Sequence, residues 1–203
     1  GSKNELNFEA RIKAISALPN EPIALVGCEN GVVYRIGIKD KSQSVFASKS
    51  SARVEAIFQT EQGSTIAVGY SDGTVNVYTK NGTLLKALSG LGSVVDIKVN
   101  KANDVLAVAY SSRLIRLYAL SDLTKLPIEI KTERPIKALD FDEATQEVFI
   151  YLTDRTIHKY PIRADWYIGQ LQGKVNRALS QEEWKTFVGD DIPFNATQIK
   201  TTK

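Results

Sequence analysis

A four-residue, mainly apolar motif recurs four times along this chain of 203 residues. The first residues of successive copies are 42, 40 and 42 positions apart, and such a period indicates that one supersecondary unit is repeated several times. The repeat therefore restricts the architecture before any chemistry is considered. The copies are Ile12-Lys13-Ala14-Ile15, Val54-Glu55-Ala56-Ile57, Val94-Val95-Asp96-Ile97 and Ile136-Lys137-Ala138-Leu139.

Each copy of the motif opens a longer unit with the pattern of several short strands. An apolar run, a polar turn and an alternating segment follow each motif, and a further short run closes the first three units. Asn30-Gly31 and Asp72-Gly73 fall in two of the turns, and such pairs predict a hairpin with positive φ at both central residues. Four antiparallel strands in about 41 residues predict an all-β fold, a β-propeller of four-stranded blades. The apolar runs are 23–26, 66–68, 105–108 and 148–151; the alternating segments are 32–36, 74–78, 114–118 and 156–160; the closing runs are 44–47, 84–88 and 128–130.

The alternating segments predict which side chains lie between neighbouring blades. Successive residues of a strand point to opposite faces of the sheet, and the repeat keeps one apolar position equivalent in all four units. We expect the side chains at this position to be buried between blades. They are Val33, Val75, Ile115 and Ile157.

The units resemble those of the WD-repeat family of propellers. In that family the third strand typically follows an Asp-Gly turn and ends in an aromatic residue, as in the segment from Ser71 to Tyr78. Tyr118 and Tyr160 stand at the equivalent places in the next two units, whereas the family's hallmark final Asp is replaced throughout. The resemblance covers residues 10–162. It implies a propeller that acts as a scaffold or sensor by binding other proteins.

The period ends after Tyr160, and residues 163–203 predict a helical tail. Trp166, Ile168, Leu171 and Val175 can share one helical face, and Ser180 with Glu183 has the spacing of a capping box. The tail resembles that of propellers at the ends of bacterial multidomain proteins, including STAND-type signalling proteins, although the cysteine pair of such tails is absent. The resemblance implies a bacterial origin and the carboxyl-terminal part of a longer polypeptide. The matching residues are Arg177, Leu179, Ser180, Glu183, Trp184, Gly189, Pro193 and Phe194. Without a cysteine staple, we expect Trp166 and Trp184 to be buried against the propeller.

Composition and charge exclude several classes of protein. Hydrophobic residues make up 43% of the chain, yet no apolar stretch approaches the ~20 residues that span a bilayer. The net charge is +3 and the basic residues are scattered, whereas a nucleic-acid surface usually carries a clustered basic patch. A single cysteine, Cys28, allows no internal disulfide. We therefore expect a cytoplasmic protein with a protein partner and with neither nucleic acid nor membrane as partner.

No catalytic, cofactor or metal site is expected, and the chain is predicted not to be an enzyme. The only histidine, His158, cannot form a triad or a multi-histidine zinc site, and it is interpreted as a strand-surface residue. Cys28 is interpreted as a half-buried blade residue. The acidic residues Asp140, Asp142 and Glu147 could bind calcium, but they lack the ligand series of a calcium loop, so a solvated turn is favoured.

The starts of the inner strands form the candidate binding site at the mouth of the propeller channel. These positions hold Arg11, Arg53, Ser93 and Pro135, which offer two cations and neither an acid nor a nucleophile. Two functions remain open on this reading. The favoured one is a non-catalytic interaction or sensor module, and the alternative is a propeller that binds a small anionic ligand or acts as an enzyme at the channel mouth.

The chain is expected to comprise three parts. Residues 1–10 hold a Gly-Ser pair typical of cloning and an outer closing strand, residues 11–162 form four blades, and residues 163–203 form the tail. The fourth unit lacks an outer strand, and residues 4–10 have the place of one. This segment could close a four-bladed ring within one chain, pair with the fourth unit of a second copy, or belong to a preceding blade. An arc of a larger ring with twofold self-association is favoured.

Overall fold

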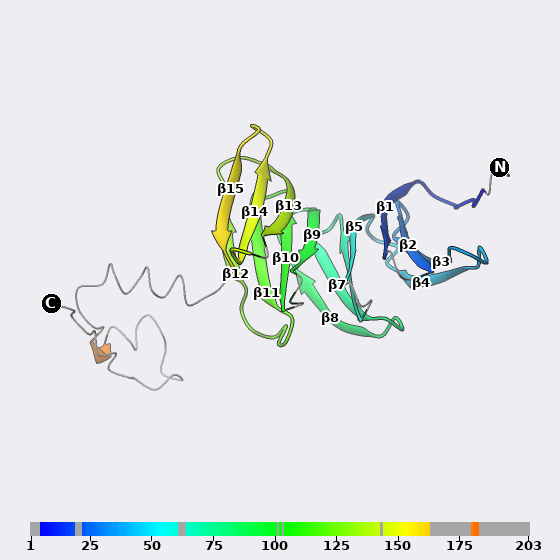
Figure 1. Cartoon of the computed structure of the whole chain (residues 1–203), viewed down its shortest axis with the longest axis horizontal. Coiled ribbons are helices and arrows are strands. Elements are labelled where there is room, and N and C mark those ends of the chain that lie inside the picture. Colours follow the sequence, from blue (N-terminus) through cyan, green and yellow to red (C-terminus); the bar gives the residue numbers. More distant parts are fainter. Residues whose placement is uncertain are drawn as a thin grey trace. The chain divides into compact units, whose positions relative to one another are not determined.

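The computed structural model describes residues 5–18, 22–60, 64–100, 102, 104–142, 144–162 and 180–182. The chain divides into two units, Gly1–Ile162 and Arg163–Lys203. All the described strands lie in the first unit (Figure 1). The expected helices of the tail and the burial of Trp166 and Trp184 lie outside the described residues, of which only Ser180–Glu182 belong to the tail.

The first unit consists of four antiparallel sheets that follow one another along the chain. The first three blades have four strands each, in sequence order, and the fourth blade has three. This arrangement confirms the predicted all-β propeller. The strands of blade 1 are β1 (Ile12–Ala17), β2 (Ile23–Cys28), β3 (Val32–Gly37) and β4 (Gln43–Ser48); of blade 2, β5 (Val54–Gln59), β6 (Thr65–Tyr70), β7 (Thr74–Thr79) and β8 (Leu84–Ser89); of blade 3, β9 (Val94–Val99), β10 (Val105–Tyr110), β11 (Leu114–Ala119) and β12 (Ile128–Lys131); of blade 4, β13 (Ile136–Asp142), β14 (Glu147–Leu152) and β15 (Ile157–Pro161).

The turns between the second and third strands have one geometry in all four blades. In each, the last residue of the turn has positive φ and donates its N–H to the carbonyl three residues earlier, at 3.1 to 3.2 Å. The expectation of positive φ at both central residues is therefore wrong, because only the last residue of each turn, Gly31 or Gly73, has it. Blades 3 and 4 place Arg113 and Arg155 there, with φ of 66° and 71°.

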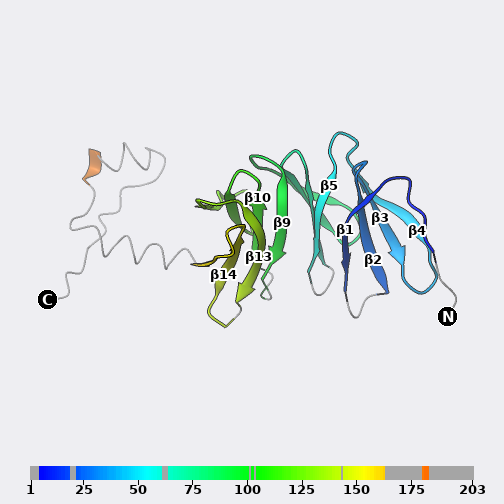
Figure 2. The same cartoon turned by 90° about the horizontal axis from the view of Figure 1, so that it is seen from above.

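The core lies between the blades. The inner strands are in contact in the order β1, β5, β9, β13, as Figure 2 shows. Val33, Val75 and Ile115 are fully buried at the three junctions, which confirms their prediction. Ile157 is 57% exposed, so the same prediction is wrong for blade 4. The reason is that no blade among the described residues follows β15.

The amino-terminal segment covers part of the face of blade 1 that no other blade covers. Phe8 and Ala10 pack against a buried cluster formed by Val26, Cys28, Tyr34 and Ile36. The Phe8 ring meets the Tyr34 ring edge-on, with the centroids 5.5 Å apart. Residues 5–10 form no strand. The expected outer strand is therefore not formed within this chain.

Candidate interaction surface

The predicted channel-mouth residues occupy equivalent positions at one end of the four blades. The carbonyl of each accepts a hydrogen bond from the N–H that follows the second strand of the same blade, at 2.8 to 3.0 Å. The pairs are Glu29 to Arg11, Ser71 to Arg53, Ser111 to Ser93 and Thr153 to Pro135. This bond recurs in every blade, so the sequence register of the repeat was predicted correctly.

The cations at the mouth lie beside carboxylates. Arg53 contacts Glu55 at 3.1 Å, and Lys13 lies 3.9 Å from the same residue. Arg11 lies 3.9 Å from Glu29. The four mouth positions themselves hold no acid, but Glu55, two residues after Arg53, and Glu29, which follows β2, lie beside the two arginines. An anionic ligand here would have to compete with these carboxylates.

The acidic residues after β13 stabilise a turn. The Asp142 carboxylate accepts the N–H groups of Ala144 and Thr145, and the side-chain hydrogen bond with Thr145 lowers its pKa despite some desolvation. Glu147 pairs with Lys159 at 3.3 Å on the neighbouring strand. In the part of the chain that is described, no group of three or more His, Cys, Asp or Glu side chains is arranged to hold a metal ion. The solvated turn remains the better interpretation.

The two candidate nucleophiles of the sequence are set apart from one another. Cys28 is completely buried at the end of β2, where desolvation raises the pKa of its thiol. A buried thiol of raised pKa is a weak nucleophile. His158 lies exposed on β15, 6.5 Å from the Tyr160 ring. Neither side chain has the surroundings of an activated catalytic group.

Asp96 is a polar contact between blades that the sequence analysis did not single out. Its carboxylate accepts the N–H of Leu139 in the next blade at 2.8 Å and that of Ile97 at 2.8 Å. Burial raises the pKa of this carboxyl, although these hydrogen bonds oppose the rise. The signal was present, because the other three motifs have alanine at this position. Asp96 therefore ties blade 3 to blade 4.

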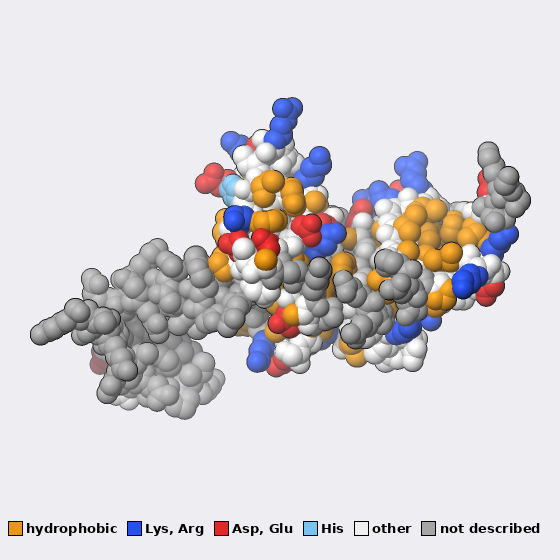
Figure 3. Space-filling view, in the orientation of Figure 1, with side chains coloured by type: hydrophobic (Ala, Val, Ile, Leu, Met, Phe, Trp, Pro, Cys, Tyr) orange, Lys and Arg blue, Asp and Glu red, His pale blue; other side chains and the backbone are white. Residues whose placement is uncertain are grey.

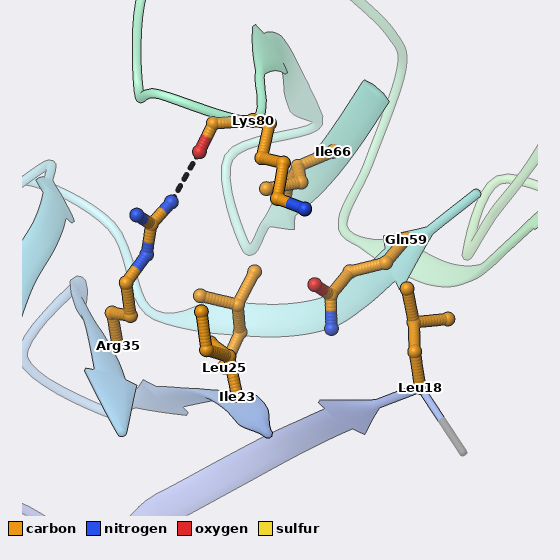
Figure 4. A pocket seen from close by; sticks show the side chains of 7 residues that line it. All are labelled: Leu18, Ile23, Leu25, Arg35, Gln59, Ile66 and Lys80. Carbon is orange, nitrogen blue, oxygen red and sulfur yellow. Dashed lines mark hydrogen bonds between the residues drawn. The ribbon is translucent and has the colours of Figure 1, made fainter. Parts of the chain in front are cut away.

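Blades 1 and 2 enclose a narrow pocket, drawn in Figure 4. Its volume of about 20 Å³ is enough for a single water molecule. The Arg35 guanidinium donates to the Lys80 carbonyl and stacks on Phe46, while its buried Nε has no protein partner. Gln59 donates to the Ser16 carbonyl at 2.8 Å. The pocket is lined by Leu18, Ile23, Leu25, Arg35, Gln59, Ile66 and Lys80, and its size suits a structural water rather than a substrate.

Exposed apolar side chains also lie on the inner strand of blade 1. Ile12 and Ile15 are 41% and 64% exposed, whereas the first residue of the motif is buried in each of the other three blades. In those blades the motif packs against the preceding blade so closely that a Cβ on Gly27 would lie 2.4 Å from Val54 Cγ1. Hydrophobic side chains also gather over blade 1 in Figure 3. Ile12 and Ile15 therefore form part of a blade-packing surface that no blade covers among the described residues.

The other open surface is at blade 4. Among the described residues, its third strand, β15, pairs with β14 and no fourth strand joins the sheet. The backbone of β15 is thus an edge, and unpaired strand edges are templates for pairing with further chain. Ile157 is exposed on this edge strand.

Comparisons with known proteins address the fold. No protein-family model and no curated protein matches this chain. Among solved structures, it is similar to the computationally designed Ika4 protein, with a TM-score of 0.69 and 18% identity over 80% of this chain and 99% of that one. The designed Ika8 protein matches with a TM-score of 0.64 and 17% identity, over 76% of this chain and 46% of that one. The propeller fold is therefore shown. At 17% to 18% identity, this structural similarity is evidence for the fold only.

Proposed function

We propose that the first unit is a non-catalytic protein-interaction module. The exposed Ile12 and Ile15 carry this proposal, because the same motif positions are packing contacts in the other blades. Exposed apolar surface of this kind and an open strand edge are each typical of protein-binding sites. The partner therefore binds at the free ends of the blade series rather than at the channel mouth, whose arginines lie beside carboxylates.

A more specific assignment rests on the resemblance of the sequence to WD-repeat propellers. The spacing of the units supports a WD-repeat-like propeller, and the tail motif supports the carboxyl-terminal part of a larger cytoplasmic bacterial protein. In such a protein the propeller would present a rigid surface to a protein partner. No cofactor is needed for this role.

Site-specific photo-crosslinking tests the proposal. A photoreactive amino acid replaces Ile15 in one variant and Leu126, a control residue that is 95% exposed on a loop, in another. We expect irradiation in the native cells to give a discrete protein adduct from position 15 and none from position 126. Equal adduct patterns at the two positions would contradict the proposal.

A thermal-shift panel of anionic metabolites tests the channel-mouth alternative. The interaction module predicts no specific shift for any of them, in the parent or in Arg53→Ala. A metabolite that stabilises the parent but not Arg53→Ala, together with turnover of that metabolite, would favour the alternative.

A further inference from the structure

Among the described residues, blade 4 lacks the outer strand that the other three blades have. In blades 1 to 3 the fully buried residue of the third strand lies opposite a residue of the outer strand: Val33 opposite Ala47, Val75 opposite Leu88, and Ile115 opposite Ile130. The counterpart in blade 4 is Ile157, which has no residue opposite it in an outer strand. An outer strand of blade 4 would therefore need an apolar residue that faces Ile157.

A backbone carbonyl of blade 4 also lies where an outer strand would supply a hydrogen-bond donor. The carbonyl of the residue before the third strand accepts an N–H from the chain that follows the outer strand, as from Gly90 to Gly73 at 3.0 Å and from Thr132 to Arg113 at 3.0 Å. The corresponding carbonyl of blade 4 belongs to Arg155. Within the described residues, no N–H from an outer strand donates to it.

Residues 5–10 have the spacing of the missing strand. Leu6 lies six residues before the first motif, just as Leu88 and Ile130 lie six residues before the third and fourth motifs. Leu6, Phe8 and Ala10 alternate with polar residues, as a strand with one apolar face requires. By this spacing, Leu6 is the residue that would face Ile157.

The packing of Phe8 supports the same assignment. The Phe8 ring meets the Tyr34 ring of blade 1 edge-on, with the centroids 5.5 Å apart. Phe8 stands four residues before its motif, as Gly90 does, and a Cβ on Gly90 would lie 2.0 Å from the Tyr110 ring. Blade 1 has the small Cys28 at the place of Tyr110, so the larger Phe8 is accommodated. Residues 5–10 thus already lie where the outer strand of a preceding blade belongs.

We propose that two copies of this chain associate by strand exchange. Residues 5–10 of one copy form the fourth strand of the β13–β15 sheet of the other, and the Arg155 carbonyl accepts a backbone N–H from that strand. Blade 4 of the second copy then covers Ile12 and Ile15 of the first. This deepens the proposed function, because it names a second copy as the partner at the exposed motif.

Strand exchange would cover the exposed Ile12 and Ile15 of blade 1 and would pair the edge strand β15 in one step. The two junctions of such a pair are identical, so a twofold axis closes the assembly without leaving an edge. The blades superpose on 46% of the longer Ika8 chain, so their packing is compatible with an array of about twice the length. Within one chain, no contact of similar extent to those between neighbouring inner strands joins β13 to β1 in the described part. A second copy supplies the strand and the covering blade that the described residues of one chain do not.

The new junction differs from the other three at one position. Gly27, Gly69 and Ala109 receive the motif of the following blade, whereas blade 4 has Tyr151 at this place. Ile12 and Ile15 of the partner copy therefore pack against an aromatic ring instead of backbone. This makes a junction between blade 4 and blade 1 different from the three junctions between blades 1 to 4.

The first test is the mass of the full chain in solution. Light scattering should give twice the 22.4 kDa of one chain. Ile157→Asp should raise the dissociation constant at least about tenfold, because it puts a charge in the apolar contact with Leu6. Leu126→Asp is the matched control on an exposed loop and should leave the mass unchanged. Circular dichroism checks that both variants fold. A strictly monomeric parent, or a dimer that Ile157→Asp does not weaken, would overturn strand exchange.

Disulfide trapping tests the pairing itself. Two proteins are prepared in a Cys28→Ala background, one with Leu6→Cys and the other with Ile157→Cys, and are mixed before mild oxidation. A disulfide-linked heterodimer is expected, and Leu6→Cys mixed with Leu126→Cys should give none. If only the double variant Leu6→Cys/Ile157→Cys reacts, and within one chain, the ring closes intramolecularly and the proposal fails. If position 15 crosslinks to a different protein, the interaction module stands and strand exchange fails.

Discussion

A charge placed at the same strand position of two blades should have opposite consequences. Val75 of β7 is completely buried between blades 2 and 3, whereas the equivalent Ile157 of β15 is largely exposed. Val75→Asp should abolish folding at neutral pH, and Ile157→Asp should leave the fold intact. The two substitutions introduce the same side chain into the same local strand geometry. Any difference in the stability of the two variants therefore measures the effect of a neighbouring blade at that position.

The magnitude follows from burial. Loss of the buried valine side chain costs about 1.5 to 3 kcal/mol, and a buried carboxyl group without hydrogen-bond partners costs about 1 to 3 kcal/mol more. Keeping that carboxyl protonated at pH 7, about three units above its ordinary pKa, adds about 4 kcal/mol. The total of about 6 to 10 kcal/mol is comparable to the whole stability of a typical domain. Ile157→Asp should cost the fold of a single chain only about 0.5 kcal/mol, as surface substitutions do, in addition to its weakening of the contact between two copies.

Thermal and urea unfolding followed by circular dichroism measure both variants. Burial raises the pKa of the carboxyl that Val75→Asp introduces above its unfolded value, so the destabilisation should shrink as the pH falls towards 4. Val75→Ala separates the charge from the cavity, and should cost only about 1.5 to 3 kcal/mol. If Val75→Asp unfolds at the same temperature as the parent at pH 7, β7 does not point this side chain between the blades and the reasoning is refuted.

Three further predictions follow from single contacts. Gly69→Ala should destabilise the fold by about 1 to 3 kcal/mol in urea unfolding, because its Cβ would lie 2.5 Å from Val94 Cγ1; an unchanged midpoint would mean that the junction can spread freely. The Cys28 thiol should react with a thiol reagent at neutral pH only after the protein is unfolded, since it is buried and its pKa is raised; rapid reaction of the native protein would contradict this. Lys49→Met should cost about 0.2 to 1 kcal/mol at pH 7, because Lys49 pairs with Asp72 at 2.7 Å. Partial burial tends to raise the pKa of Asp72, but the hydrogen bonds of Lys49 and Thr74 outweigh it and lower that pKa. The stability that the ion pair adds is therefore fully present above the unfolded pKa of ~3.9. It disappears as the pH falls through the lowered pKa of the folded protein. An equal loss in parallel melts at pH 7 and pH 2 would argue against the pair.

The sequence predicted those features that depend on local pattern. The period located all the strands, and alternation identified Val33, Val75 and Ile115 as junction residues, because a strand has only two faces. The same argument failed for Ile157. An apolar residue at a repeat position looks identical whether or not a following blade covers it, so exposure at the ends of the series is not encoded locally.

The candidate site was predicted less well, because it depends on contacts between strands. The sequence placed Arg11 and Arg53 at equivalent positions correctly. Glu55 follows Arg53 by two residues and was visible in the sequence, whereas only the fold brings Glu29, which follows β2, beside Arg11. The blade-1 surface was missed for the same reason as Ile157: the motif of blade 1 is as apolar as the motifs that are buried.

The junctions between blades share one backbone frame but differ in their polar contacts. At the first junction, Gln59 of blade 2 donates to the Ser16 carbonyl of blade 1. At the third, Asp96 of blade 3 accepts the Leu139 N–H of blade 4. A blade placed beside the wrong neighbour would leave one of these buried groups without its partner, at a cost of about 1 to 3 kcal/mol. These polar contacts therefore make the first and third junctions different from one another, although the apolar residues of the repeat are equivalent in both.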